Sequence, residues 1–480
     1  MSALVTAARV DPFDVVAAAE EPGVASRPFL FADDATLGYR AVAGLVRDRA
    51  SSLRQSGVGP GSAVAFPAPC TVETVITILA LVHIGATLVP VHPRSLPHEA
   101  DALVARAGAS VVLGPGAAAS GGRPDDGRPQ GERGADGLAI VFTSGTSGAP
   151  KGAVLTRDAF AASVRASAAN LGVADDDRWL LCMPLAHVGG LSVVLRSVAS
   201  RRAIVVVPGF TPPDVLVAVE RHCATLLSAV PTMLRSLLDA DQGEALRRLR
   251  AVLVGGAAAP LPLLQACERR GVVALATYGM TETCSQIATQ EPPPAGEVRR
   301  ARAGCGRPLP GVEVRILDAD SREAAVGVAG RIHVRGRMIM RGYLGEAPRE
   351  RGAFFDTGDD GWLDERGELH LVGRRTDRIV TGGENVDPVE VEHALELSGM
   401  VRAALVFGAP DDRWGHVVSA ALVPAAGFDP SELATHVAAT LAPHKRPRRF
   451  VEVDSLPTTA GGKLDRAGAV VRLAGRLRDL

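Results

Sequence analysis

Short apolar runs alternate with longer amphipathic stretches along most of this chain. Short runs flanked by Gly or Pro are typical of buried strands, whereas apolar positions that recur about every three to four residues predict helices. Such an alternation favours mainly parallel sheets that are covered by helices on both faces. We expect helices over 39–57, 71–85, 157–172, 191–200, 212–222, 231–240 and 260–270, and strands over 86–91, 138–142, 179–183, 203–207, 225–230, 251–254 and 272–279.

The pattern changes twice toward the C-terminus. Residues 304–372 are rich in strand-like segments, which predicts a small β subdomain. Past Arg375, expected helices over 388–397 and 431–441 mix with expected strands over 401–408, 416–423 and 450–454, a layout that favours a compact α+β domain. We therefore expect a large α/β N-terminal domain over residues 1–376 and a small α+β C-terminal domain over residues 377–480.

Composition and charge narrow the class of protein. The chain has a formal net charge of −1 and a sequence pI near 6.8, which points away from a nucleic acid or a membrane surface as partner. The longest apolar stretch, 71–91, contains Glu73 and His83, so we interpret it as core and not as a membrane span. The first residues lack a signal-peptide pattern, and the six cysteines lack CxxC spacing. We expect a cytoplasmic protein with buried thiols, and we leave its oligomeric state open, with a homodimer as one alternative.

A loop rich in Gly, Ser and Thr is the first candidate for chemistry. It follows an apolar run in the segment LAIVFTSGTSGAPKGAVLT, residues 138–156. Its backbone N–H groups, its hydroxyls and Lys151 would form a concavity suited to a polyphosphate. Only three lysines occur among 52 Lys and Arg residues, and a lysine kept against that bias suggests a role for a flexible point charge. The loop lacks Walker A spacing, and the alternative interpretation is a flexible surface turn.

Three further clusters combine polar residues with turn-forming ones. The segment 278–283, YGMTET, follows an expected strand, at the edge where open parallel sheets bind ligands. There a ring could stack on a base, a hydroxyl could bond a phosphate and a carboxylate could hold Mg²⁺, although a capped helix start is an equal alternative. The segments 357–359, TGD, and 457–463, PTTAGGK, could by themselves be a turn and a tail.

Together these clusters closely resemble the motifs of the acyl-adenylate-forming superfamily, which includes acyl-CoA synthetases, luciferases and adenylation domains of peptide synthetases. Its patterns TSGTTGxPKG, YGxTE, TGD, GRxxD and PxTxxGK have counterparts in the right order between residues 138 and 466. The resemblance implies that Tyr278, next to Gly279, packs against adenine, that Thr281 contacts the α-phosphate and that Glu282 binds magnesium. It implies a phosphate-binding loop made of Thr143, Ser144, Gly145, Thr146, Ser147, Gly148 and Lys151.

The same resemblance assigns the remaining motifs. Asp359 would accept the ribose hydroxyls, and Arg374 would assist at the ribose or phosphate. Asp377 would be the hinge between the two domains. Lys463 would be the catalytic lysine that bridges the attacking carboxylate and the α-phosphate, acting with Thr281 and Glu282. The carboxylates Glu390 and Glu392 are expected to be solvated, without chemistry.

The segments 184–196 and 255–260 bear on the acid substrate. They look like the o-succinylbenzoate–CoA ligases of menaquinone biosynthesis, whose counterpart of the first is PLFHISGLSxLxRS, although Ala186 replaces the usual Phe and GGAAAP the usual GGGPAP. The alternative for the histidine of the first segment is a helix-capping or core residue, and for its arginine an ordinary surface or ion-paired cation. The resemblance implies acid-binding roles for His187, Ser192, Arg196, Gly255 and Gly256.

The expected activity is that of an AMP-forming acid–thiol ligase. A carboxylate would attack the α-phosphate of ATP with Mg²⁺ present, and coenzyme A would then displace AMP from the acyl-adenylate. The partners would be a small carboxylic acid and CoA. Two alternatives stay open: a broader aryl- or fatty-acid–CoA ligase, and a non-catalytic nucleotide-binding protein.

Overall fold

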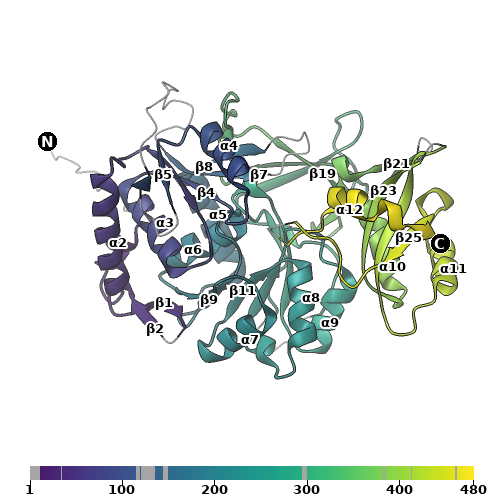
Figure 1. Ribbon diagram of the computed structural model, residues 1–480, viewed down its shortest axis with the longest axis horizontal. Helices are drawn as coiled ribbons and strands as arrows, with labels where there is room; N and C mark the ends of the chain where they lie inside the picture. Colours follow the sequence, from purple (N-terminus) through teal and green to yellow (C-terminus); the bar gives the residue numbers. More distant parts are fainter. Residues whose placement is uncertain are drawn as a thin grey trace.

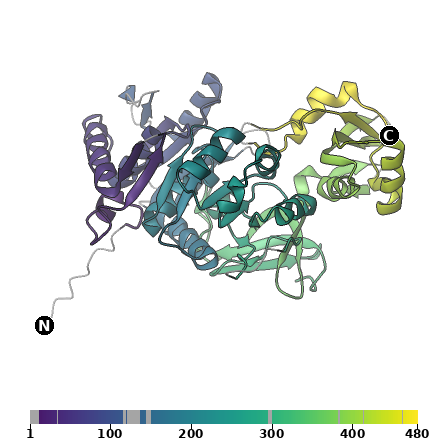
Figure 2. The ribbon, with the colours of Figure 1, turned by 90° about the horizontal axis from the view of Figure 1, so that it is seen from below.

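The computed structural model describes residues 11–33, 35–114, 119–120, 136–143, 150–294, 300–381, 384–411, 413–459 and 462–480. A large N-terminal part and a smaller C-terminal part lie next to each other along the longest axis of the molecule (Figure 1), and the same division is visible from below (Figure 2). Within the described residues, the large part is built on two sheets of mainly parallel strands and a smaller antiparallel one.

The first large sheet has nine strands, and its central strands from β13 to β1 all pair in parallel. In spatial order it contains β15 (Arg307–Pro308), β14 (Ala288–Thr289), β13 (Ala274–Tyr278), β12 (Ala251–Val254), β11 (Leu226–Ala229), β9 (Arg178–Leu181), β10 (Ala203–Val206), β1 (Pro28–Ala32) and β2 (Ala35–Gly38).

The second large sheet has seven strands, and its central strands β5, β3, β4 and β7 are parallel. In spatial order it contains β18 (Gly342–Tyr343), β8 (Lys151–Thr156), β7 (Gly137–Thr143), β4 (Thr87–Val91), β3 (Ala63–Pro67), β5 (Val111–Leu113) and β6 (Ala119–Ser120). The strand β8 confirms that a strand, and not a helix, follows the candidate phosphate loop.

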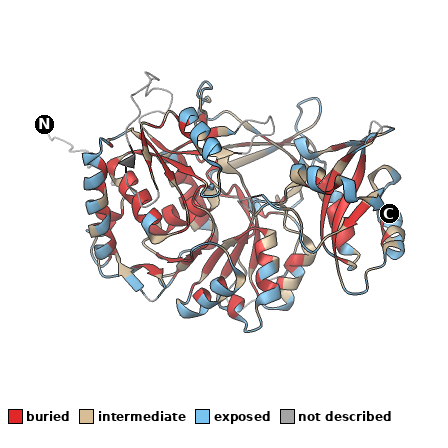
Figure 3. Ribbon diagram, viewed as in Figure 1, coloured by how far each residue is buried: buried red, intermediate tan, exposed pale blue. Residues whose placement is uncertain are grey.

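Helices cover both faces of these sheets. The helices α2 (Tyr39–Gln55), α3 (Val72–Ile84), α5 (Arg157–Leu171) and α6 (Val188–Ser200) pack in the core shared by the two sheets, together with the short α1 (Val15–Ala18). The outer face of the first sheet is covered by α7 (Pro212–Arg221), α8 (Pro231–Ala240), η3 (Ala245–Arg248) and α9 (Leu261–Arg269), and that of the second by α4 (Pro97–Ala107). The buried residues follow the strands and the inward sides of these helices (Figure 3).

Two smaller sheets complete the fold. An antiparallel sheet contains β16 (Val312–Leu317), β17 (Gly330–Gly336), β19 (Phe355–Leu363) and β20 (Leu369–Arg374), which confirms the β subdomain. The C-terminal sheet contains β22 (Glu384–Val386), β21 (Ile379–Thr381), β24 (Gly415–Pro424), β25 (Arg449–Glu452) and β26 (Arg478–Asp479), with β23 (Val401–Asp411) paired to β24. Its helices are α10 (Pro388–Leu397), α11 (Pro430–Thr440) and α12 (Arg466–Leu473). The short 3-10 turns η6 (Pro443–Lys445) and η7 (Ala474–Arg476) follow α11 and α12. The expected fold class is confirmed.

Three expectations differ from the structure. Helix α6 begins at Val188, because the chain turns at Pro184 and the N–H of His187 already bonds the carbonyl of Pro184. Glu392 is buried and paired with Arg466, so its interpretation as a solvated carboxylate was wrong. All six cysteines are free, but Cys223 is exposed and not buried. Most of residues 114–137, a segment rich in Gly, Ala, Asp and Arg, lies outside the described residues. In the part of the chain that the structure describes, no helix is long and apolar enough to cross a membrane.

Candidate active site

The candidate phosphate loop joins β7 to β8. These strands are antiparallel, with Thr143 opposite Lys151, and the Thr143 hydroxyl donates to the Lys151 carbonyl over 3.4 Å. The predicted residues Ser144, Gly145, Thr146, Ser147 and Gly148 lie outside the described residues. The Lys151 ammonium is 3.6 Å from the Glu346 carboxylate and 4.8 Å from the centre of the Tyr343 ring. The structure therefore fixes where the loop begins and ends.

The candidate metal carboxylate follows β13 in a single 3-10 turn, η4 (Thr281–Thr283). An ideal Cβ added at Gly279 would lie 1.6 Å from the carbonyl oxygen of Ser285, so only glycine lets the chain fold back here. The turn buries Glu282, which is 5% exposed, and one of its oxygens accepts a hydrogen bond of 2.7 Å from the Tyr343 hydroxyl. Thr281 at the start of the turn is half-buried.

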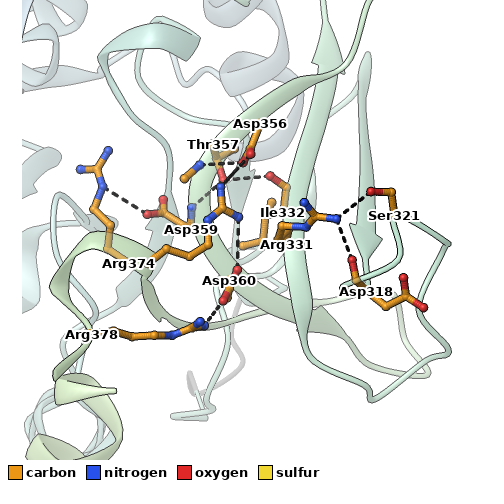
Figure 4. A network of polar contacts seen from close by, with 12 residues as sticks. Asp318, Ser321, Arg331, Ile332, Asp356, Thr357, Asp359, Asp360, Arg374 and Arg378 are labelled. Atoms are coloured by element: carbon orange, nitrogen blue, oxygen red, sulfur yellow. Dashed lines mark hydrogen bonds and ion pairs between the residues drawn. The ribbon is translucent and has the colours of Figure 1, made fainter. Parts of the chain in front are cut away.

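The candidate ribose group lies where β13 faces β19. The Tyr278 hydroxyl donates to the Asp359 carboxylate over 2.7 Å, and the Arg374 guanidinium lies 3.6 Å from the other oxygen of that carboxylate. Asp359 and Arg374 are directly paired in register between β19 and β20 (Figure 4). Burial raises the pKa of both Tyr278 and Asp359, although the hydrogen bond from Tyr278 and the charge of Arg374 act against the shift at Asp359.

The acids on either side of Asp359 have their own arginines. Arg375 binds Asp356 at 2.6 Å and Asp360 at 3.3 Å, and Arg378 also binds Asp360 (Figure 4). Asp377, the predicted hinge residue, lies between these arginines in the 3-10 turn η5 (Arg375–Asp377), directly after β20. The Arg466 guanidinium is 3.6 Å from the Asp377 carboxylate, and Asp377 therefore joins the β subdomain to the C-terminal part.

Lys463 of the C-terminal part lies close to the same residues. We call the region formed by Lys463, Glu282, Asp359, Arg374 and Gly256 the crevice. The neighbouring carbonyl of Gly462 accepts a 2.9 Å hydrogen bond from the Thr232 hydroxyl of α8, which ties the loop to the large part. An ideal Cβ at Gly256 would lie 3.3 Å from Lys463 Cε. The lysine side chain still reaches solvent, yet the surrounding protein lowers its pKa, first by desolvation and then by repulsion from Arg374, while Glu282 and Asp359 oppose the shift.

The candidate acid-binding residues line α6 and the turn before it. His187 precedes the helix without capping it through its side chain, and its ring centre is 5.5 Å from that of His92. Although the imidazole touches solvent, desolvation followed by repulsion from His92 and Lys463 lowers its pKa to about 4. His187 is therefore neutral at pH 7. It is the N-cap residue of α6 by position, but its side chain makes no capping hydrogen bond, and it is exposed and not a core residue.

Arg196 is the unusual cation of this region. It is 5% exposed, its guanidinium donates to the Ser285 hydroxyl over 3.3 Å, and it lies 5.4 Å from the centre of the Trp179 ring. No carboxylate pairs with it among the described residues, and its Nε and the buried Ser192 hydroxyl have no hydrogen-bond partner there. Burial lowers its pKa to about 10. The alternative of an ordinary surface or ion-paired cation was wrong.

The two predicted glycines follow β12 on the far side of the crevice. An ideal Cβ at Gly255 would lie 2.7 Å from Thr277 Cγ2, and Gly256 has φ of +79°, which favours glycine. The structure thus brings Gly256, Lys463, Glu282, Asp359 and Arg374 to one crevice, with His187 at its edge. Sequence reasoning missed three residues of this crevice, namely Tyr343, His92 and Glu346, because none of them lies in a motif that signals chemistry.

Comparisons with known proteins agree with this arrangement. A family model described as AMP-binding enzyme matches residues 16–344, and one described as AMP-binding enzyme C-terminal domain matches residues 390–463. A 2-succinylbenzoate–CoA ligase from Bacillus velezensis is 41% identical over 336 residues, which are 69% of this chain and 68% of the relative.

Solved structures extend the similarity to nearly the whole chain. The o-succinylbenzoate CoA synthetase from Bacillus subtilis, in complex with the acyl-adenylate intermediate OSB-AMP, has a TM-score of 0.80 at 32% identity and covers 95% of this chain and 97% of its own. The same enzyme in complex with ATP and a magnesium ion has a TM-score of 0.79 at 31% identity, with coverages of 94% and 98%. With a family model matching well over half of its length, this chain belongs to the AMP-binding enzymes.

Proposed function

We propose that this protein is an ATP-dependent acid–CoA ligase that converts 2-succinylbenzoate to its CoA thioester, a step of menaquinone biosynthesis. The expected ligase class and the expected acid agree with the curated relative and with the solved enzyme in complex with its acyl-adenylate. The observation that carries the proposal is the crevice in which Lys463 approaches Glu282 and Asp359 from the C-terminal part.

The reaction has two steps that share one carbonyl carbon. A substrate carboxylate oxygen attacks the α-phosphorus of ATP, the bond to the β-phosphate oxygen breaks, and pyrophosphate leaves. The sulfur of CoA then attacks the acyl carbon, AMP leaves with the bonding electrons, and the thiol proton passes to solvent. Because the leaving groups are good, the protein contributes mainly positioning and charge stabilisation.

We assign the nucleotide roles to the residues of the crevice. Asp359 would accept the ribose hydroxyls while Tyr278, packed beside it, fixes the carboxylate with its hydroxyl. Arg374 and Lys151 would neutralise phosphate charge, with Thr143 and Thr281 as hydroxyl donors. Lys463 would bridge the attacking carboxylate and the α-phosphate and would stabilise the charge that develops there.

Glu282 fits the expected magnesium ion. A hard cation takes oxygen ligands, and Mg²⁺ is commonly held by one or two carboxylates together with substrate phosphates and water. The Glu282 carboxylate is buried at the crevice, and only one of its oxygens is engaged by Tyr343. When bound, the ion would neutralise triphosphate charge.

The acid would lie between His187 and Arg196. Arg196 lies nine positions after His187, which corresponds to about 13 Å along a helix, and helical side chains lean toward the N-terminus. The Arg196 guanidinium lies beside the Ser285 hydroxyl and the Trp179 ring. An acid with two carboxylates could place one at the α-phosphate and the other near Arg196 and Ser192. Among the described residues, no carboxylate pairs with Arg196, and the Ser192 hydroxyl has no hydrogen-bond partner.

We further propose the division at residues 376 and 377 with Asp377 as the pivot, because the turn η5 is the covalent link between β20 and the C-terminal sheet. Pro at 377 restricts φ and the preceding residue, so it should allow pyrophosphate release but stall thioester formation. The cytoplasmic location is supported by the six free thiols, and the homodimer stays a prediction that sedimentation would test.

A panel of carboxylic acids scored by pyrophosphate release tests the proposal. We expect 2-succinylbenzoate to have the highest kcat/KM. If benzoate or a medium-chain fatty acid exceeds it, the protein is a broader aryl- or fatty-acid–CoA ligase. If no acid releases pyrophosphate although ATP binds, the protein is a non-catalytic nucleotide-binding protein.

A further inference from the structure

Tyr343 lies between two charged groups of opposite sign that come from distant parts of the chain. Its hydroxyl donates to the Glu282 carboxylate over 2.7 Å, and the Lys151 ammonium lies 4.8 Å from the centre of its ring. Glu346, three residues further on, is 3.6 Å from the same ammonium. One phenol therefore contacts the candidate metal carboxylate through its oxygen and the candidate phosphate lysine through its ring.

Backbone pairing fixes this tyrosine in place. The short strand β18 pairs with β8, with Gly342 opposite Val154 and Tyr343 opposite Ala153. On one side of it, the N–H of Met340 bonds the carbonyl of Glu282 at 2.7 Å. On the other side, the N–H of Leu344 bonds the carbonyl of Gly152 at 2.8 Å. The same segment is thus hydrogen-bonded to η4 and to the strand that begins at Lys151.

We propose that Tyr343 is a positioning residue for the magnesium–triphosphate end of ATP, a role that rests on the proposed functions of Glu282 and Lys151. Its O–H occupies one oxygen of the Glu282 carboxylate, and the other oxygen would remain available to hold the cation. Its ring face holds the Lys151 ammonium at the end of the phosphate loop by a cation–π contact. Because both contacts belong to one rigid side chain, the spacing between carboxylate and ammonium is set before the nucleotide binds.

Two substitutions separate the two contacts. Tyr343→Phe removes the O–H but keeps the ring, and we expect the Mg²⁺ concentration for half-maximal ATP binding to rise about fivefold or more, with ATP affinity at saturating Mg²⁺ within about twofold of wild type. Tyr343→Leu also removes the ring, and we expect ATP affinity at saturating Mg²⁺ to fall as well, by about fivefold or more. The matched control is Tyr39→Phe, because that buried hydroxyl donates only to the carbonyls of Ser197 and Arg202.

The readout is calorimetric titration of ATP at a series of Mg²⁺ concentrations, followed by pyrophosphate release with 2-succinylbenzoate. An unchanged Mg²⁺ requirement in folded Tyr343→Phe overturns the proposal, as does an equal change in Tyr39→Phe. If instead the proposed function is wrong, the wild type binds Mg·ATP without releasing pyrophosphate. The titrations of ATP against Mg²⁺ concentration would still test the role of Tyr343 in that case. A wild type that does not bind Mg·ATP overturns both.

Discussion

The nucleotide end and the acid end of the crevice differ in how their ionisable groups are paired. At the nucleotide end, Glu282 is paired with Tyr343, Asp359 with Tyr278 and Arg374, and Lys151 with Glu346. At the acid end, Arg196 is buried without a carboxylate among the described residues, and His187 is held neutral. One end is balanced before any ligand arrives, and the other is not.

The difference follows from what each ligand brings. ATP arrives with magnesium and several charges, so a site with paired groups can exchange its internal partners for phosphate oxygens and the cation. A buried cation without a counter-ion is costly, and an anion that reaches it gains both charge pairing and hydrogen bonds. The unbalanced end therefore favours an acid with a second carboxylate over a monoacid of similar size.

Lys463→Ala should have the largest effect, because this lysine is the charge that both ends share. Loss of a preorganised donor at the developing charge costs about 10²–10³-fold in rate. We expect this loss in acyl-AMP formation, while conversion of supplied acyl-AMP and CoA to thioester continues. Single-turnover assays of each half-reaction measure both.

The matched control is Lys445→Ala, which removes another lysine of the C-terminal part whose ammonium pairs with Glu390 at 2.7 Å, away from the crevice. Equal loss of both half-reactions in folded Lys463→Ala would contradict the assignment and make Lys463 a structural residue.

Arg196→Met tests the acid end directly. Methionine keeps much of the apolar stem but removes the charge, so the second carboxylate of 2-succinylbenzoate loses its partner, at a cost of about 1–3 kcal/mol, or roughly 5–150-fold in kcat/KM. Activity with benzoate should change little. Stability should stay equal or rise, since a buried unpaired charge is removed.

Arg196→Lys keeps the charge but not the planar donor group, and it should recover only part of the activity. If benzoate and 2-succinylbenzoate lose activity equally in Arg196→Met, Arg196 supports the fold and does not bind the acid.

Most of the fold could be predicted from the sequence because its elements are long or strongly patterned. Helices α8 and α10 and strand β12 have the bounds expected from their apolar periodicity. Helix α12 was not expected, since it is only eight residues long, and the pair β1–β2 was missed for the same reason of length. Short elements depend on tertiary pairing, which local pattern does not encode.

The site shows the same limit. Motifs located Glu282, Asp359 and Lys463, but Tyr343 lies in a strand of two residues, and its contact with Glu282 depends on the pairing of β18 with β8. Glu392 was misjudged because helix position alone does not show that Arg466, 74 residues away, will bury it. Partners of this kind become visible only when the chain is folded.

Tyr278→Phe probes the balanced end and should have a moderate effect. It removes one of the groups that stabilise the Asp359 charge, so the pKa of Asp359 should rise further above its usual range. A hydrogen bond to a charged group contributes about 1.5–3 kcal/mol, but Arg374 remains, so we expect a rise in KM for ATP of about tenfold or less. The rise should be larger at low pH, where Asp359 becomes protonated, and KM for the acid should not change. An effect on the acid instead of ATP in steady-state assays would show that the two ends are not independent.

Glu396→Gln should have the smallest effect on activity, and it extends the comparison to a buried charge that is only weakly paired. Glu396 of α10 is 3.5 Å from Arg235 of α8 and accepts the N–H of Ala404 at 3.2 Å, and burial raises its pKa to about 7 despite Arg235. Because the pKa of Glu396 is higher in the folded than in the unfolded protein, the stability from this group is fully present below pH 4.5 and is lost as pH rises through about 7.

Glutamine keeps the acceptor without the charge. The free energies of unfolding in urea at pH 5 and pH 8 should therefore differ less in the variant than in the wild type, by on the order of 1–3 kcal/mol. Glu390→Gln, which alters a solvent-exposed pair, is the matched control, and a Glu396→Gln protein that keeps the full pH dependence would show that Arg235 already compensates this charge.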